Sequence, residues 1–208
     1  KGTSYVITVT GGVTDDAGNG LASNYQFKFT TDATAPTVST ASVSDMTLQP
    51  SISLTFSEAL AMLSVSGSTV LLSPAADATI RIPLVFTFSS DHKTITLNLS
   101  SKLVKATSYV LTVTTNVTDE AGNGLETPYQ LAFSTDGTPP LVTAATVTPD
   151  SISSLPASPI FTISFSESLA AASVSDSTVK ITAVSDPNTT IPVTHALSTD
   201  RKSITVRP

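Results

Sequence analysis

The chain has 208 residues, a net charge of −6 at pH 7 and no cysteine, and only 12% of its residues are charged, about half the usual share. The acidic balance argues against a nucleic-acid or anionic-membrane partner, which would require clustered lysine and arginine, and the lack of cysteine excludes disulfides and thiol chemistry. Serine and threonine fill the place of the charged residues, which is typical of β-sheet because β-branched side chains fit a pleated strand well.

Two predicted strands and the turn between them begin the chain, and all three return further on. The stretch TSYVITV at residues 3–9 reappears as TSYVLTV at residues 107–113. The turn TDDAGNG at residues 14–20 reappears as TDEAGNG at residues 118–124, again at an offset of 104. Self-similarity at a fixed period indicates a tandem array of one folded unit.

A second block repeats later in the chain, at an offset of 109. The stretch LTFSEALAMLSVSGSTV at residues 54–70 returns as ISFSESLAAASVSDSTV at residues 163–179. The two blocks together define one complete module over residues 35–138. We expect residues 1–34 to be the last two strands of such a module and residues 139–208 to be the first five strands of another.

The complete module shows the alternation of apolar and polar residues that half-buried strands require, for example in SLTFS, TITLNLS and YVLTVT. The stretch EALAMLSV is long enough only for a helical turn. The pattern predicts seven strands, at residues 37–44, 51–57, 68–73, 80–88, 93–99, 107–115 and 128–135. Seven short strands in about a hundred residues predict an all-β fold of tandem Ig-like β-sandwiches.

The repeated turn joins the sixth and seventh strands of a module. Gly18 and Gly20 allow positive φ angles, and Asn19 tolerates such a conformation. Asp15 is expected to accept hydrogen bonds from nearby backbone N–H groups. The turn recurs because each module needs this connection.

These residues resemble the bacterial Ig-like domains of S-layer and large surface proteins, and the resemblance covers essentially the whole chain. The matching pieces are P-x-V at 36–38, FSE at 56–58, D-x-K-T-I-T at 91–96, Y-x-x-T-V at 109–113, T-D-x-A-G-N at 118–123 and F-S-T-D at 133–136. The resemblance implies an extracellular, multi-domain, non-catalytic protein.

Calcium is the candidate ligand, because it prefers hard oxygen donors. Asp32 and Asp136 lie at predicted module junctions, where related bacterial adhesins hold calcium, and Asp15 and Asp119 lie in the repeated turn. The other interpretation is that these four residues only cap turns. Calcium needs roughly six to eight oxygens, and the sequence has no dense cluster like an EF-hand loop.

Other polar residues give little support to catalysis. Glu58 and Glu167 occupy equivalent positions after a strand, which predicts a shared role such as capping the next turn. No second acid repeats at the spacing of an acid/base pair, and no G-x-S-x-G elbow occurs. His92 in a hairpin turn and His195 in a strand do not align, so both are expected to be surface or packing residues.

The two partial modules need strands from elsewhere. Our hypothesis is completion in trans, in which residues 1–34 of one copy supply the strands that residues 139–208 of another copy lack; this contact builds a filament. Domain-swapped closure into a dimer is a second form of completion. The rival explanation is a window on a longer array, and the start Lys1-Gly2-Thr3, which does not begin a signal peptide, fits such an internal piece.

The sequence predicts a mechanical role in a bacterial extracellular surface or filament protein, as a spacer or assembly unit. The alternative is a carbohydrate- or ligand-binding adhesin module that uses loops at one end of the sandwich. Four tyrosines recur at equivalent positions of the repeat, which favours packing over a sugar-stacking surface. No apolar run approaches the roughly 20 residues of a membrane-spanning helix.

Overall fold

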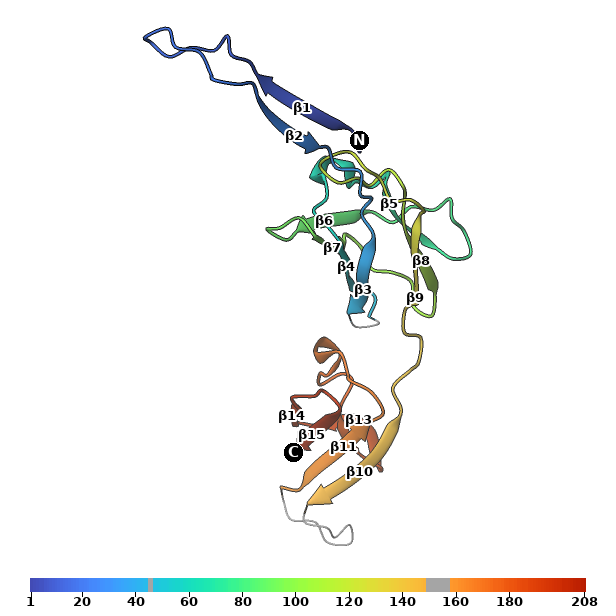
Figure 1. The fold of residues 1–208 in the computed structure, drawn as a ribbon. Coiled ribbons are helices and arrows are strands. Elements are labelled where there is room, and N and C mark those ends of the chain that lie inside the picture. The colour runs from blue at the N-terminus through green and yellow to red at the C-terminus, as the bar shows by residue number, and fades with distance from the viewer. Residues whose placement is uncertain (45–46, 149–157) are drawn as a thin grey trace. The chain divides into compact units, whose positions relative to one another are not determined.

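The structure is a computed structural model that describes residues 1–44, 47–148 and 158–208 (Figure 1). The regular secondary structure is almost all β-strand, and the chain divides into two compact units, residues 1–137 and 138–208. Within the described ranges, no helix has the length and apolar character needed to cross a membrane.

An antiparallel hairpin begins the first unit. Strands β1 (Ser4–Val9) and β2 (Tyr25–Thr30) pair along their whole length, from Ser4 opposite Thr30 to Val9 opposite Tyr25. The pairing extends into the loop through a bridge between Thr14 and Gly20. Nearly all side chains of both strands are exposed, including the apolar ones on the face that carries Tyr5, Ile7 and Phe29.

The rest of the first unit is a sandwich of two antiparallel sheets, one of order β3-β4-β7-β6 and one of order β5-β8-β9. A 3₁₀ helix, η1 (Met62–Ser64), forms where the sequence predicts a helical turn. The strands are β3 (Val38–Ser44), β4 (Ser51–Phe56), β5 (Val70–Pro74), β6 (Leu84–Phe88), β7 (Thr94–Leu99), β8 (Ser108–Val113) and β9 (Tyr129–Ser134). Each predicted strand therefore has a counterpart, and the all-β, Ig-like prediction is confirmed.

The core lies between these two sheets because alternate residues of each strand point inward. Strand β4 alternates half-buried and fully buried residues along its whole length, as its SISLTF sequence requires. The buried residues from both sheets form one cluster, which includes Ile52, Leu54, Val70, Leu72, Ile95, Leu97, Tyr109, Leu111, Val113 and Phe133. The sandwich is thus closed by the sheet that contains β8 and β9.

The second unit repeats the larger sheet, in the order β10-β11-β15-β14, and adds a two-stranded sheet of β12 and β13. A 3₁₀ helix, η2 (Ala171–Ser173), occupies the position equivalent to η1. The strands are β10 (Val142–Thr148), β11 (Ile160–Phe165), β12 (Ile181–Ala183), β13 (Asp186–Ile191), β14 (Thr194–Leu197) and β15 (Ser203–Arg207).

The described part of the second unit has six strands where the sequence predicts five, and β13 is the additional one. The predicted fourth strand of the module is split by a proline, Pro192 in this unit and Pro83 in the first. Proline has no N–H to donate to the ladder, so pairing stops before it and resumes after it. Ile191 pairs with Ile181 on one side of the break, as Ile82 bridges to Leu72 in the first unit.

Candidate functional site

The repeated turn is a tight loop held by an aspartate and an asparagine. Asp119 accepts hydrogen bonds from the Asn123 backbone N–H and side-chain amide, both at 2.7 Å. Asp15 accepts the same two bonds from Asn19, at 2.8 Å and 3.0 Å. The predicted bonds from backbone N–H groups to Asp15 are confirmed. The bonds from the Asn19 side chain and then from its backbone are the chief reasons that the pKa of Asp15 lies below its usual value.

The two glycines of this turn have different structural roles. Gly18 has φ of 86° and its counterpart Gly122 has φ of 82°. Gly20, which would also allow a positive φ, does not adopt one. Gly20 and its counterpart Gly124 are instead sites of close approach, where a Cβ would collide with a backbone carbonyl oxygen of the facing strand end.

Three carboxylates meet beside this turn, from three separate segments of the first unit. Asp32, Glu58 and Asp119 each place one oxygen within 4.8 Å of the others. Asp32 lies between β2 and β3, Glu58 follows β4, and Asp119 lies between β8 and β9. Their side chains run from exposed for Asp32, through half-buried for Glu58, to Asp119 at 3% exposed. We call this group the junction cluster.

Backbone hydrogen bonds bring these segments together. Leu60, two residues after Glu58, bridges to Asp119. The Ala61 N–H donates to the Thr118 carbonyl at 2.9 Å. On the other side, the Ser57 N–H donates to the Thr37 carbonyl at 2.9 Å, which fixes the segment that follows Asp32. The convergence of the three carboxylates is therefore a property of the backbone, not of flexible side chains.

The junction cluster is electrostatically unfavourable without a counter-charge. Burial and the neighbouring carboxylates of Asp119 and Asp32 raise the pKa of Glu58, and Lys93 opposes this only in part. One oxygen of Glu58, Oε1, is fully buried and accepts no hydrogen bond among the described residues. The pKa of Asp32 is lowered, chiefly because its carboxylate accepts bonds from the Thr34 backbone and side chain.

These features fit a divalent cation with oxygen ligands. A buried carboxylate oxygen without a hydrogen-bond donor is the acceptor that such an ion would satisfy, and three carboxylates are the hard donors that Ca²⁺ prefers. Calcium takes about six to eight oxygens, so backbone carbonyls and water would complete the shell.

The structure brings together two of the four residues predicted from sequence. Asp32 and Asp119 belong to the junction cluster. Asp15 lies in the exposed hairpin turn, and Asp136 follows β9, where its carbonyl accepts a bond from the Ala106 N–H at 3.2 Å.

Sequence reasoning did not assign Glu58 as a ligand. The turn-capping role predicted for it is not seen at η1, which begins after Ala61 and has no side-chain cap. The FSE motif recurs with Glu167 in the place of Glu58, and this recurrence could have indicated a functional role for Glu58.

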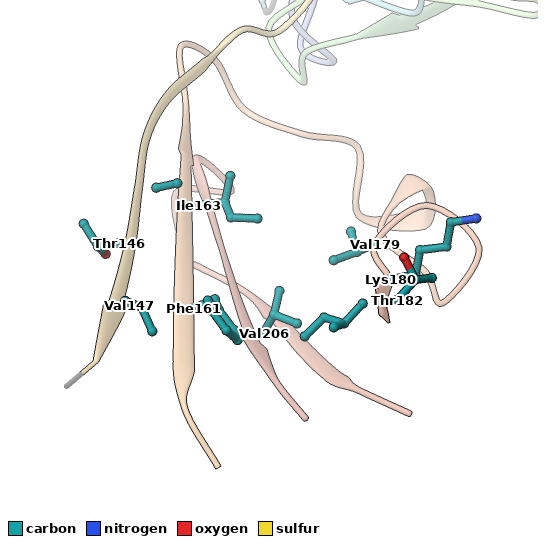
Figure 2. Close-up of a pocket in the computed structure, with 10 residues that line it drawn as sticks. Thr146, Val147, Phe161, Ile163, Val179, Lys180, Thr182 and Val206 are labelled. Carbon is teal, nitrogen blue, oxygen red and sulfur yellow. The ribbon is translucent and has the colours of Figure 1, made fainter. Parts of the chain in front are cut away.

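A second feature is a hollow in the second unit, with a volume of about 580 Å³. Phe161, Ile163 and Val206 line it from β11 and β15, and Val179 and Thr182 lie across it on and beside β12 (Figure 2). In the first unit the equivalent space between the sheets is filled by the side chains of β8 and β9.

The fold and the repeated turn define a class: all-β proteins built from Ig-like sandwiches in tandem. The sequence profile of the bacterial Ig-like domain matches residues 1–31 and 32–135. The chain belongs to this family, which is one of Ig-like structural domains. No curated protein matches the sequence.

Solved structures with a similar fold include bacterial S-layer proteins. The N-terminal part of the S-layer protein SbsC aligns over 64% of this chain and 41% of its own, with 16% identity and a TM-score of 0.41. Native alpha-2-macroglobulin of E. coli aligns over 54% of this chain and 6% of its own, with 15% identity and a TM-score of 0.40. This chain thus spans less than half the length of either matched chain, and at these identities the likeness concerns the fold alone.

Proposed function

We propose that this chain is a non-catalytic structural segment of a bacterial extracellular surface protein, in which Ig-like sandwiches joined end to end act as a stiff spacer. The family, the tandem repeat and the all-β fold support this role. The observation that carries it is the junction cluster, because its members come from the segment that enters the complete module and from two loops of that module.

A cation bound here would act as a clamp. Asp32 belongs to the segment between the hairpin and the sandwich, whereas Glu58 and Asp119 are fixed to the sandwich. An ion shared by the three would hold that segment against the module and relieve the repulsion at Glu58. Pro36, fully buried just beyond, already restricts the same segment. Calcium is the proposed ion, since it tolerates irregular oxygen shells.

An adhesin role has less support. The exposed aromatic residues Tyr5, Phe27 and Phe29 lie on hairpin strands, and their counterparts in the repeat are the packing residues Tyr109, Leu131 and Phe133. Exposed aromatics with such counterparts fit a packing face better than a sugar-stacking platform.

The clamp is tested by thermal unfolding and by digestion with a protease of broad specificity, each with calcium or with EDTA. Calcium should raise the melting temperature and protect residues 31–37 from cleavage, because a ligand that binds only the folded state stabilises it by about 2.7 kcal/mol at 100 times its Kd. Asp32→Asn should remove both effects.

Glu120→Gln is the matched control, because Glu120 is exposed, lies next to Asp119 and is outside the junction cluster. This variant should respond to calcium as the parent chain does. A parent chain with the same melting temperature and the same cleavage pattern in calcium and in EDTA would rule out the clamp.

A further inference from the structure

We propose that the chain leaving the complete module is held against that module by a packing site that accepts a single methyl group. Residues 135–137 are then part of the folded module and not a free linker. The site lies between Ala106 and Gly137, and we call it, with the hydrogen bonds of Thr107 and Thr135 beside it, the exit latch. The inference rests on the proposed spacer function, because it explains how a linker is held at the end where it leaves a module.

Ala106 and Gly137 come from separate segments of the complete module and lie against each other. Ala106 lies in the connection between β7 and β8, and Gly137 lies three residues after β9. A Cβ added at Gly137 would lie 2.3 Å from the Cβ of Ala106 and 2.9 Å from its Cα, well inside the ordinary contact distance of two carbon atoms. The space between the two residues therefore accepts one methyl group and not two.

Backbone conformation does not explain why residue 137 is glycine. Ala106 has φ of 52°, whereas Gly137 has no positive φ. Glycine adopts a positive φ without strain, so a conformational requirement alone would place glycine at position 106. The chain has alanine there and glycine at 137, which indicates that the close approach requires the glycine at 137.

The same pair recurs in the hairpin, with the methyl group on the other side. At an offset of 104, Gly2 is the counterpart of Ala106, and Ala33 is the counterpart of Gly137. Gly2 has φ of 62°, and a Cβ added there would lie 3.2 Å from the Cβ of Ala33. Each pair thus contains one alanine and one glycine, in opposite order, as a site of fixed volume requires.

Hydrogen bonds hold the two segments of the exit latch together. The Thr107 N–H donates to Thr135 Oγ1 at 3.1 Å, and the Thr135 N–H donates to the Thr107 carbonyl at 3.0 Å. Thr135 Oγ1 donates to the Val104 carbonyl at 2.6 Å, and the Ala106 N–H donates to the Asp136 carbonyl at 3.2 Å. Thr135 is 5% exposed, so water has little access to these bonds. They keep Ala106 in its left-handed conformation, because such strain persists only where the surrounding structure over-determines it.

The hairpin repeats the threonine bonds of the exit latch. The Thr3 N–H donates to Thr31 Oγ1 at 3.1 Å, and the Thr31 N–H donates to the Thr3 carbonyl at 3.1 Å. Thr3 and Thr31 are the counterparts of Thr107 and Thr135. Because the packing and the polar contacts recur together, the exit latch belongs to the repeated unit.

The exit latch acts on the module that a linker leaves, whereas the junction cluster acts on the module that a linker enters. In the linker at residues 31–37, Ala33 lies against Gly2, and Asp32 lies in the junction cluster. A linker restrained at both ends has fewer conformations than a flexible one, which is the property that a stiff spacer needs.

The experiment is a double-mutant cycle that measures amide hydrogen exchange in the 208-residue chain in EDTA. Gly137→Ala should place two methyl groups in the site. The N–H groups of Thr107 and Thr135 should then exchange faster by about 5-fold to 150-fold, which corresponds to the usual free-energy range of overpacking. Ala106→Gly should not speed exchange in this way, because it removes a methyl group and suits a positive φ.

The double variant, Ala106→Gly with Gly137→Ala, builds the arrangement of Gly2 and Ala33 at the exit latch. It should restore the slow exchange of the parent chain, because the site again contains one methyl group. Gly67→Ala is the matched control, since a Cβ at Gly67 meets open space and Gly67 has no positive φ. This variant should exchange as the parent does.

Three results would overturn the proposal. They are exchange of the Thr107 and Thr135 N–H groups in the parent as fast as in exposed loops, a Gly137→Ala variant that exchanges like the parent, and a double variant that exchanges as fast as Gly137→Ala alone. If one of these results appears while the parent still responds to calcium, the proposed spacer function stands and the exit latch does not.

Discussion

Glu58 is a carboxylate held in a position that favours its protonated form. Its pKa is raised by burial and by Asp119 and Asp32, so the folded state binds a proton more tightly than the unfolded state does. In the metal-free chain the ionised form therefore costs stability, and this cost appears as the pH rises from the ordinary glutamate pKa of 4.5 through the raised pKa of Glu58.

Glu58→Gln should stabilise the metal-free chain at pH 7 by about 1 kcal/mol or less, the usual range for partly exposed charges. The reason is that it removes the repulsion between Glu58 and the neighbouring carboxylates. Below the pKa of the unfolded state the difference should vanish, since Glu58 is then protonated in both states. Urea unfolding of both proteins in EDTA at pH 4 and pH 7 measures this difference in the free energy of unfolding.

Calcium should make the parent chain more stable than the Glu58→Gln variant at pH 7, because the variant lacks one ligand of the ion. A metal-free Glu58→Gln variant less stable than the parent at pH 7 would contradict the idea that Glu58 lies in a repulsive site.

The loop between β8 and β9 depends on a close approach at Gly124. A Cβ added at this position would collide with the backbone carbonyl oxygen of Thr115, and backbone cannot move aside as a side chain can. Gly124→Ala should therefore destabilise the chain by about 1–3 kcal/mol, the usual range for overpacking. Gly67→Ala should cost much less, because a Cβ at Gly67 meets open space and Gly67 has no positive φ.

Chemical denaturation of the two glycine variants in EDTA tests this claim. Because Asp119 lies in the same loop, Gly124→Ala should also weaken the calcium response, whereas Gly67→Ala should not. Equal stability of the two variants would show that the loop relaxes around the added methyl group.

The strands were predictable because each is a short apolar–polar alternation, and the repeats were predictable because turn and strand recur together. SISLTF and SYVLTV need no tertiary information to be identified as half-buried strands. The splitting of the fourth strand at Pro83 and Pro192 was visible in principle, since proline cannot donate to a ladder.

The junction cluster was only partly predictable. Asp32 stands out because an aspartate recurs at the module junction, and Asp119 because it lies in the repeated turn. Glu58 becomes a cluster member only through the bridge between Leu60 and Asp119, a contact between residues far apart in the sequence. The close approach at Gly124 depends on the same kind of contact, which spacing along the chain does not encode.

At the scale of the whole molecule, the acidic residues recur with the module. Asp136 is the counterpart of Asp32, and Glu167 is the counterpart of Glu58. The second unit therefore begins with the same acidic positions as the complete module, as a spacer built from one repeated unit requires.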